Sequence, residues 1–350
     1  MIDKRKLFNS HFLDAHYFDE NNLEGLPAYL LKKGLIDHDE KVISTEKPGE
    51  GNMNFVRRVT TDKRSFILKQ GRPWVEKYPD IKAPVERLEV EAKYYKTIAS
   101  DPFYSAYSPG LLDYDPENLI LVFEDLGVGS DFTFLYNKSQ IFHEELLTSL
   151  VAYISHLHNS DLRNYKSQFP SNQALKRLNH EHIFNYPYLV ENGFDLNAIH
   201  PGLQDISMTV KMNDSLKGKI LGLGQKYLSS GPVLIHGDYY PGSWLKVDHE
   251  VKVIDPEFAY FGYAEFDVAV MAAHLIMTWM ELDKVENALN KYRKRSDFDY
   301  KLFSGFCGTE ILRRIIGLAQ LPLDLTLSEK SELIDLAIEL INLPKSHKLL

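Results

Sequence analysis

Val233-Leu234-Ile235-His236-Gly237-Asp238 and Val251-Lys252-Val253-Ile254-Asp255-Pro256-Glu257 are two short apolar runs that each end in acidic residues. Each run has the length and composition of a buried strand, so we expect each carboxylate where a strand ends. If these two strands pair with each other, Asp238 lies near Asp255 and Glu257. An Asp at a strand end beside Gly or Pro is also a common turn signal, so either motif alone is consistent with a purely structural turn.

The three carboxylates together have the chemistry that phosphoryl transfer requires. Transfer from a metal-bound nucleotide needs Mg²⁺ to neutralise the phosphate oxygens, and a further acceptor to orient the attacking hydroxyl and take its proton. We expect Asp255 and Glu257 to serve the metal and Asp238 to serve the hydroxyl. In kinase-like folds a second metal ligand usually lies five residues after the catalytic Asp, and Ser243 occupies that position here.

The composition is that of a globular protein with an acidic charge balance. The chain has 350 residues, more than a single core usually supports, and its 44% of hydrophobic residues can fill two lobes. Forty basic and forty-nine acidic residues give a formal net charge of −9, which argues against broad contact with nucleic acid. Cys307 is the only cysteine, so no internal disulfide can form, and a reducing compartment fits best.

No segment of the sequence has the pattern of a secretory signal or a membrane span. The charged N-terminal residues lack a following apolar stretch. The longest apolar run, Val268–Met280, is interrupted by His274 and is shorter than the ~20 residues that a span needs. We therefore expect a cytoplasmic protein with neither a membrane nor a nucleic acid as its partner.

The organisation along the chain predicts an α+β fold. The first third alternates strands with one helix, and strands are expected at 41–46, 53–60, 65–69 and 119–123, with the helix at 85–100. Residues 124–129 suit a connector between lobes. Long helical patterns follow, clearest at 141–158, 210–228, 266–280 and 309–318. We expect a small lobe over 1–125, built on an antiparallel sheet, and a larger, mainly helical lobe over 126–350.

Lys69 is the first candidate for a nucleotide contact. It follows the apolar residues 66–68 of an expected strand, so its ammonium emerges from a mostly buried sheet and needs a partner. Glu91 on the next helix is the leading candidate, because a Lys–Glu pair would hold the ammonium toward ATP phosphates. The alternative is a surface lysine at a strand end. The glycine turn at 49–52 could let backbone N–H groups approach a phosphate, although hairpins use glycine routinely.

The order of these motifs resembles the aminoglycoside phosphotransferase-like small-molecule kinases, and within that family the 5-methylthioribose kinase branch most closely. The resemblance covers most of the chain and rests on residues 51–56, 67–70, 72–75, 87, 91–92, 122–126, 236–238, 242–243, 253–260, 266–267 and 313–317. It implies a two-lobed, protein-kinase-like fold, ATP and Mg²⁺ as cofactors, a small hydroxyl-bearing substrate and a possible homodimer.

The resemblance also implies a role for each matching residue. Asp238 would be the catalytic base, and Asp255 and Glu257 would hold Mg²⁺ with Ser243. Asp267 would brace the catalytic loop through its backbone. The residues implied to contact the nucleotide are Asn52, Asn54, Lys69 with its partner Glu91, and, through the backbone around adenine, Phe123, Glu124, Asp125 and Leu126.

Arg313 and Arg314 would be the substrate or transition-state arginines of the family. Successive helical residues differ by about 100°, so these two should flank an apolar stripe on opposite sides, with only one pointing straight at the site. The alternative is a pair of solvated arginines on a surface helix.

The catalytic loop departs from the family pattern at Tyr239-Tyr240-Pro241, where the family usually has Leu-His-Thr. These positions are expected close to the acceptor, with Tyr239 as a contact, and larger rings would reshape the acceptor pocket.

The leading function is ATP-dependent phosphorylation of a hydroxyl of a small sugar-like molecule, with 5-methylthioribose, in methionine salvage, as the best candidate. The alternatives are an aminoglycoside, choline or homoserine acceptor, since aromatic rings favour a cation, and a nucleotide-binding protein without catalysis.

Overall fold

The computed structural model describes residues 3–20, 22–49, 51, 53–138, 142–278 and 280–343. The chain forms two compact units: the first comprises residues 1–130 with 252–257, and the second comprises 131–251 with 258–350. The sequence analysis placed one boundary between residues 125 and 126. The structure divides after Ser130 and returns the second acidic motif to the first unit, so each unit contains one of the two acidic motifs.

The first unit is built on an antiparallel sheet, as the strand patterns predicted. Its strands follow the order β1–β2–β3–β7–β6. Burial alternates along β2, as expected of a strand with one buried face, whereas Ile120–Phe123 of β7 are all buried. The strands of this sheet are β1 (Val42–Glu46), β2 (Phe55–Thr61), β3 (Ser65–Gln70), β6 (Leu111–Asp115) and β7 (Ile120–Glu124).

The first unit contains more helices than the one that the sequence predicted. The expected helix is α3 (Arg87–Ile98), and α2 (Leu26–Lys32) was missed because seven residues are too few to show a helical period. Leu26, Tyr29 and Leu30 of α2 belong to the core that contains the buried faces of β2, β3 and β7. The other elements of this unit are α1 (Lys4–His11), α4 (Pro102–Ser105), and the hairpin of β4 (Trp74–Val75) with β5 (Tyr78–Lys82).

The second unit is mainly helical. Its helices are α5 (Glu144–Asn159), α6 (Gln173–His180), α7 (Leu203–Lys211), α8 (Asp214–Leu228), α9 (Ala264–Met277), α10 (Leu282–Leu289), α11 (Tyr300–Ile316) and α12 (Leu327–Asn342). Its short strands are β9 (Val233–Ile235), β10 (Trp244–Val247) and β12 (Tyr260–Gly262), while β8 (Gly129–Asp131) and β11 (Glu250–Val253) cross the boundary between units. Across the described ranges, no helix combines the length and the apolar character that crossing a membrane requires.

Two helix predictions had wrong boundaries for local reasons. The pattern at 210–228 was taken as one helix, but the chain breaks it between α7 and α8, because the Asn213 side chain caps α8 by accepting from the Leu216 N–H at 3.0 Å. The pattern at 309–318 is the second half of α11, which begins nine residues earlier, after Asp299 accepts from Lys301 N–H at 2.9 Å.

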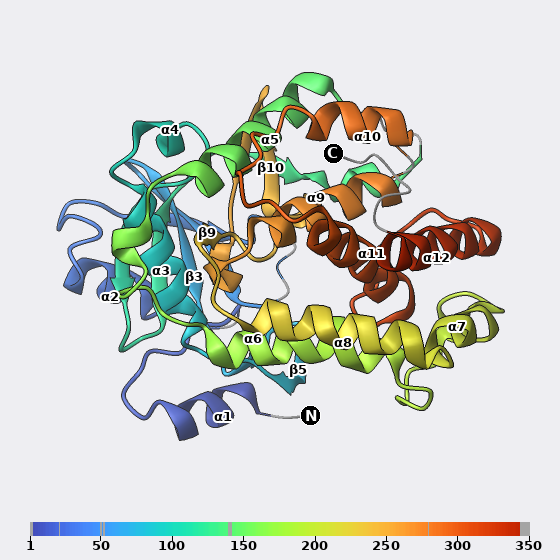
Figure 1. Cartoon of the computed structure of the whole chain (residues 1–350). Helices are drawn as coiled ribbons and strands as arrows, with labels where there is room; N and C mark the ends of the chain where they lie inside the picture. Colours follow the sequence, from blue (N-terminus) through green and yellow to red (C-terminus); the bar gives the residue numbers. More distant parts are fainter. Residues whose placement is uncertain are drawn as a thin grey trace. The chain divides into compact units, whose positions relative to one another are not determined.

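Helix α11 packs against both α9 and α12 in the second unit (Figure 1). Every residue of α9 is buried, and α11 is buried from Leu302 to Ile316. A helix that is buried on all sides belongs in a core. Charged residues on α9 and α11 are therefore held away from water. The buried arginines of α11 consequently need partners of opposite charge within the protein.

The expected pairing between the two acidic strands was wrong. β9 pairs antiparallel with β12, and Ile235 lies opposite Tyr260. β11 instead follows β10 through a tight turn in which Asp248 has a φ of 53°. Two strands joined by so short a turn are neighbours in a hairpin, and β11 pairs with β10. The apolar composition of β11 did not indicate which strand it would pair with.

Candidate active site

The candidate residues form two clusters, one in each unit. The cluster of the first unit is centred on Lys69 at the end of β3, facing Glu91 on α3. The Lys69 Nζ atom lies 2.7 Å from Glu91 Oε2 and 2.8 Å from Asp255 Oδ1. The Lys69 and Glu91 side chains are 4% and 1% exposed. We call Lys69, Glu91, Asp255, Glu257, Asn54 and Arg87 the Lys69 cluster.

Glu257 is held inside this cluster by two donors. Asn54 Nδ2 donates to Glu257 Oε2 at 2.9 Å, and Arg87 Nε donates to the same oxygen at 3.2 Å. Arg87 also donates to Asn54 Oδ1 at 2.7 Å. Asn54 thus links a cation to a carboxylate, and Arg87 is a residue to which the sequence reasoning gave no role. Arg87 is the first residue of α3 and stands between Glu86 and Leu88, so its position in the sequence carried no distinctive signal.

The charge state of Lys69 follows from its neighbours. Burial alone would lower the pKa of the Lys69 ammonium, but the carboxylates of Asp255, Glu91 and Glu257 outweigh burial and raise it. Burial raises the pKa of Glu91, and the adjacent Lys69 ammonium opposes that rise. Lys69 therefore carries a fixed positive charge at neutral pH.

Asp255 has the position and chemistry of a cation ligand. Its side chain is 50% exposed, and its backbone adopts a left-handed φ of 61°, which is uncommon for a residue with a side chain and is often found at functional sites. In the described part of the chain, no group of three or more His, Cys, Asp or Glu side chains could hold a metal. Mg²⁺ is commonly held by one or two carboxylates together with substrate phosphates. Asp255 and Glu257, as oxygen donors on one turn, fit that requirement.

The stretch expected around adenine lies at the end of β7. The Phe123 side chain is buried, and Leu126 is partly exposed. The side chains of the two acidic residues are already bonded: Glu124 Oε2 accepts from Gly110 N–H at 2.9 Å, and Asp125 Oδ2 accepts from Arg58 Nε at 2.8 Å. The backbone contact to adenine stays a prediction. Asn52, which was expected to contact ATP, lies outside the described residues.

In the second unit, the loop that carries Asp238 is fixed from both sides. Gly237 has a φ of 84°, and a Cβ at this position would lie 2.2 Å from Phe258 O, so the turn requires glycine. The Asp267 carboxylate accepts from His236 N–H at 2.7 Å and Gly237 N–H at 2.9 Å. Asp267 therefore braces the loop through its backbone.

Ser243, expected as a metal ligand, closes the same loop. Its hydroxyl donates to the Asp238 backbone carbonyl at 2.8 Å, and the residue is 2% exposed. In this arrangement its contact with the catalytic loop is structural. A role for Ser243 in metal binding stays a prediction.

Both arginines of α11 face Asp238, where only one was expected to do so. The nearest terminal nitrogens of Arg313 and Arg314 lie 3.9 and 3.8 Å from Asp238 Oδ1. Glu310 explains the difference, because Arg313 Nε donates to its Oε2 at 2.5 Å and Arg314 Nε donates to its Oε1 at 2.8 Å. One carboxylate at positions i−3 and i−4 thus draws the two guanidinium groups to the same side of the helix.

Glu310 is fixed in turn by His274 of α9, and Tyr136 completes the chain. His274 Nε2 lies 3.0 Å from Glu310 Oε1, and Tyr136 Oη lies 2.5 Å from His274 Nδ1. A carboxylate can only accept, so Nε2 carries the proton and Nδ1 accepts from the tyrosine hydroxyl. We call Asp238, His274, Glu310, Arg313 and Arg314 the Asp238 cluster.

The pKa values agree with that proton assignment. Burial lowers the pKa of His274 to about 4, so the ring is neutral at pH 7. Burial would raise the pKa of Glu310, but the two arginines and His274 hold it well below its ordinary value. Nothing in the sequence indicated a role for Glu310 or His274, because each lies within an apolar helical run and belongs to no recognisable motif.

The two tyrosines after Asp238 have different surroundings. Tyr239 is fully buried, stacks on Tyr153 and donates its hydroxyl to Leu150 O at 2.8 Å. Tyr240 is partly exposed, packs against the His274 ring and lies under the Arg314 guanidinium at 4.9 Å. Of the two, Tyr240 is therefore the residue that adjoins the Asp238 cluster, whereas Tyr239 packs in the interior.

Comparison with known proteins gives a consistent result. A methylthioribose kinase from Pectobacterium atrosepticum is 26% identical over 357 residues, covering 83% of this chain and 84% of that protein. One from Bacillus cereus (strain B4264) is 26% identical over 339 residues and covers 83% of both chains.

Among solved structures, an ethanolamine kinase from Plasmodium vivax has a TM-score of 0.55 at 12% identity, covering 99% of this chain and 94% of that one. A choline kinase from Cryptosporidium parvum has a TM-score of 0.55 at 13% identity, covering 94% and 99%. These likenesses confirm the kinase-like fold. The model of the phosphotransferase enzyme family matches residues 44–300, and the chain belongs to that family, as a small-molecule kinase.

Proposed function

We propose that the chain uses ATP with Mg²⁺ to phosphorylate a hydroxyl of 5-methylthioribose, a step of methionine salvage. Two observations support this choice of acceptor. The methylthioribose kinases named above align with most of the chain, and two guanidinium groups lie within 4 Å of Asp238. The arginine pair is the observation that carries the proposal, because it suits an anionic reaction centre with a neutral acceptor.

The second unit supplies the proton acceptor. The oxygen of the substrate hydroxyl forms a bond to the γ-phosphorus, and its proton passes to the carboxylate of Asp238. The bond between the γ-phosphorus and the bridging oxygen breaks, and ADP leaves with that electron pair. Arg313 and Arg314 offer positive charge beside the carboxylate that receives the proton, and Glu310 holds both guanidinium groups in place.

The first unit supplies the groups for the nucleotide. Lys69 carries a positive charge that can bind an ATP phosphate. The ion pair with Glu91 holds the Lys69 ammonium in place at the end of β3. Asp255 and Glu257 are the residues that would hold Mg²⁺. When bound, Mg²⁺ neutralises the charge of the phosphate oxygens. Arg87 and Asn54 orient Glu257 for that task.

An acceptor that is a cation, such as choline, ethanolamine or an aminoglycoside, is the competing candidate. The kinase-like fold is shared with a choline kinase and an ethanolamine kinase. The ring of Tyr240 could face a cation, but Arg314 already lies over that ring. A second positive charge would be repelled there, so the Asp238 cluster favours the neutral sugar.

Acceptor-dependent ADP release tests the proposal. The purified chain is assayed with ATP and Mg²⁺ against 5-methylthioribose, ribose, choline, homoserine and kanamycin, with the Asp238→Ala variant as the control. We expect kcat/KM for 5-methylthioribose to exceed that for each other compound by about tenfold or more. A higher value for choline or kanamycin would overturn the acceptor. ATP binding by calorimetry without ADP release for any compound would favour a nucleotide-binding protein without catalysis.

A further inference from the structure

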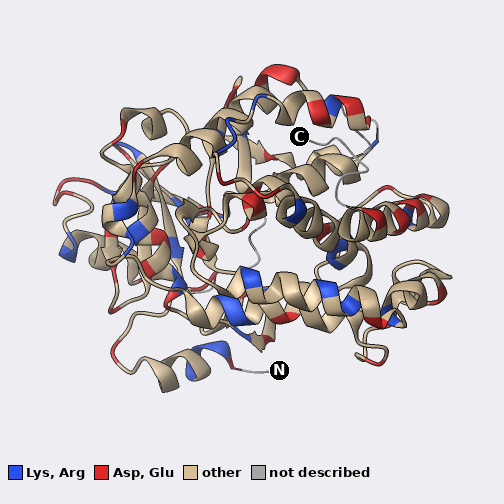
Figure 2. Cartoon of the chain, in the orientation of Figure 1, with Lys and Arg blue, Asp and Glu red and all other residues tan. Residues whose placement is uncertain are grey.

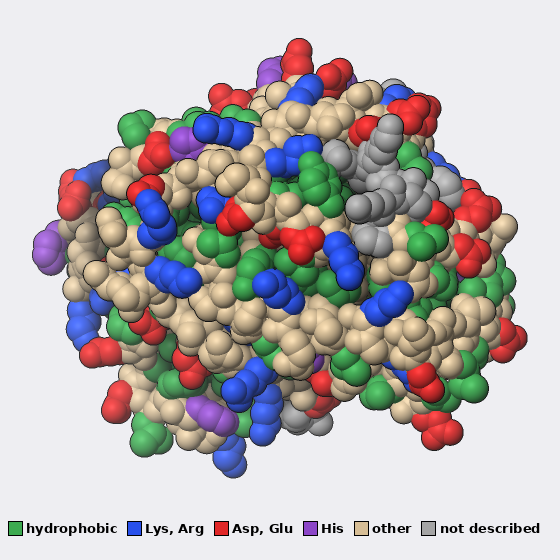
Figure 3. Space-filling view, viewed as in Figure 1, with side chains coloured by type: hydrophobic (Ala, Val, Ile, Leu, Met, Phe, Trp, Pro, Cys, Tyr) green, Lys and Arg blue, Asp and Glu red, His purple; other side chains and the backbone are tan. Residues whose placement is uncertain are grey.

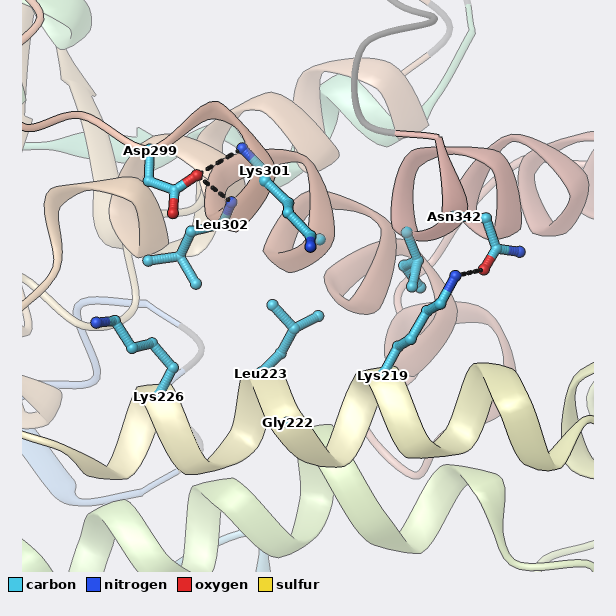
Figure 4. Close-up of a pocket in the computed structure, with 10 residues that line it drawn as sticks. Lys219, Gly222, Leu223, Lys226, Asp299, Lys301, Leu302 and Asn342 are labelled. Atoms are coloured by element: carbon cyan, nitrogen blue, oxygen red, sulfur yellow. Dashed lines mark hydrogen bonds between the residues drawn. The ribbon is translucent and has the colours of Figure 1, made fainter.

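A pocket of about 500 Å³ lies in the second unit (Figure 4). It is formed by α8, the beginning of α11 and the end of α12. Its lining includes Gly305, which precedes Arg313 by eight residues on α11, or about 12 Å along the helix axis. The pocket is therefore separate from the groups that serve phosphoryl transfer.

The polar lining of the pocket is mostly basic. Lys219 and Lys226 are two helical turns apart on α8, so both project from one face, and Lys301 extends toward them from α11 (Figure 4). Lysine positions recur along the backbone of α8 in Figure 2, and Figure 3 shows the Lys and Arg side chains of the same view. Asp299 is the acidic residue of the lining, and its carboxylate is used as the N-cap of α11.

Among the residues that the structure describes, the three lysines of the pocket have no carboxylate partner. Lys219 donates to the neutral Asn342 Oδ1 at 2.7 Å, and Lys226 lies 3.9 Å from the centroid of the Tyr263 ring. Among the described residues, no carboxylate forms an ion pair with these two or with Lys301. By contrast Lys217, on the same helix, pairs with Asp214 at 2.7 Å. In a chain of net charge −9, a group of cations with no carboxylate partner among the described residues indicates a site for an anion.

The floor of the pocket is apolar. Leu223, Leu302 and Ile341 line it together with the three lysines. Leu223 reaches into the space left by Gly305, where a Cβ would lie 2.8 Å from its side chain. On the other side, a Cβ at Gly222 would meet nothing within 4 Å, so the pocket is open above α8. An occupant therefore meets an apolar surface below and ammonium groups around it.

We propose that this pocket binds a small phosphate monoester. Three lysines and one aspartate give the lining a net charge of +2, which matches the charge of about −1.5 to −2 of a phosphate monoester at pH 7. Lysine binds phosphate as a point charge, and the apolar floor accommodates the organic part. The site takes a phosphorylated compound at a place that the transfer reaction does not use.

Methyl resonances of the pocket test the proposal on the intact chain. Ribose 5-phosphate is titrated at low ionic strength into protein with labelled Leu and Ile methyl groups, with ribose as the uncharged comparison. We expect saturable shifts of the Leu223, Leu302 and Ile341 methyl signals with ribose 5-phosphate and none with ribose. Signals that do not move with ribose 5-phosphate would overturn the proposal, even if calorimetry detects binding elsewhere.

Two pairs of variants show which charges matter. The double variant Lys219→Met, Lys301→Met should weaken the binding of ribose 5-phosphate by about tenfold or more. Lys217→Met, which lies outside the pocket, should leave that affinity unchanged. Gly222→Glu places a carboxylate in the opening and should abolish binding, whereas Gly222→Ala should retain it. Both Gly222 changes improve helix propensity, so neither is expected to unfold the chain. Equal affinity in Gly222→Glu and Gly222→Ala would overturn the proposal.

Discussion

The Lys69 cluster and the Asp238 cluster are both buried arrays of charge, but their balance differs. The Lys69 cluster has two cationic and three anionic side chains, whereas the Asp238 cluster has two of each and a neutral histidine. An acidic excess attracts a further cation. A balanced cluster instead holds Asp238, the proposed base, beside fixed positive charges, and so suits proton transfer beside an anionic centre.

The clusters also differ in which carboxylate is open to solvent. In the Lys69 cluster, Asp255 is 50% exposed while Glu91 is buried. In the Asp238 cluster, Asp238 is 23% exposed while Glu310 is buried. In each cluster the most exposed carboxylate, Asp255 or Asp238, is open to a ligand. The buried Glu91 or Glu310 holds cationic side chains in place. Neutralising an exposed carboxylate and neutralising a buried one should therefore have different effects, and these effects should differ between the two clusters.

Asp238→Ala should have the largest effect. The change removes the group that we propose takes the hydroxyl proton, so turnover should fall by about two to four orders of magnitude. The Lys69 cluster is untouched, and ATP affinity measured by calorimetry should change little. Near-normal turnover of this variant would mean that Asp238 is not the base.

Asp255→Asn should act on the metal instead of the proton. The variant keeps the shape of the side chain but loses its charge, so the Mg²⁺ concentration for half-maximal rate should rise and turnover should fall by about a hundredfold. Asp238→Asn serves as the matched change in the other cluster and should leave the Mg²⁺ dependence unaltered. An identical Mg²⁺ dependence in wild type and Asp255→Asn would contradict the assignment.

Glu310→Gln should break the balance of the Asp238 cluster. Both arginines would lose their buried counter-charge, and the free energy of unfolding should drop by on the order of 3 kcal/mol. Turnover should also fall, by about tenfold, because the guanidinium groups lose the partner that orients them, while the KM for ATP stays constant. Urea unfolding and steady-state kinetics measure these effects. A stable variant with full activity would show that Glu310 does not position the arginines.

These residues also show what could be predicted from the sequence. The sheet strands, the α3 helix and the long helical region were evident from period and composition, because those patterns are local. The contact between Lys69 and Glu91 was also foreseen, since a lysine at the end of a buried strand needs a partner. The pairing of β9 with β12 was not, because apolar composition alone does not select one strand partner over another.

The remaining errors have one physical source, which is tertiary packing. Helical spacing put Arg313 and Arg314 on opposite sides of a stripe, but α11 is buried all round, and Glu310 draws both side chains together. His274 was treated only as an interruption of an apolar run. Its role depends on Tyr136, which is far away in sequence and meets it only in the folded chain.

Stability should depend on pH through His274. Its pKa is lowered from an ordinary 6.5 to about 4, so between these values the unfolded chain binds a proton that the folded chain does not. The free energy of unfolding should therefore fall as the pH drops from 6.5 to 4, by on the order of 3 kcal/mol. Urea unfolding across this range, compared between wild type and His274→Gln, measures it. The variant should lose this part of the slope, whereas His38→Gln, at an exposed site, should keep it.

Tyr240→His should have the smallest effect and the most specific one. The change restores the residue that the family usually has in this loop and replaces the phenol ring, which lies under Arg314 and against His274, with a smaller imidazole. Only the proposed acceptor site changes, so the ratio of kcat/KM for 5-methylthioribose to that for ribose should shift by less than about tenfold, with the KM for ATP constant. Tyr239→Phe is the matched control: it loses the hydrogen bond to Leu150 O, so it should cost about 1 kcal/mol of stability and leave the ratio unchanged. If Tyr239→Phe shifted the ratio and Tyr240→His did not, the acceptor would be sensed through the buried ring, and the distinction between the two tyrosines would fail.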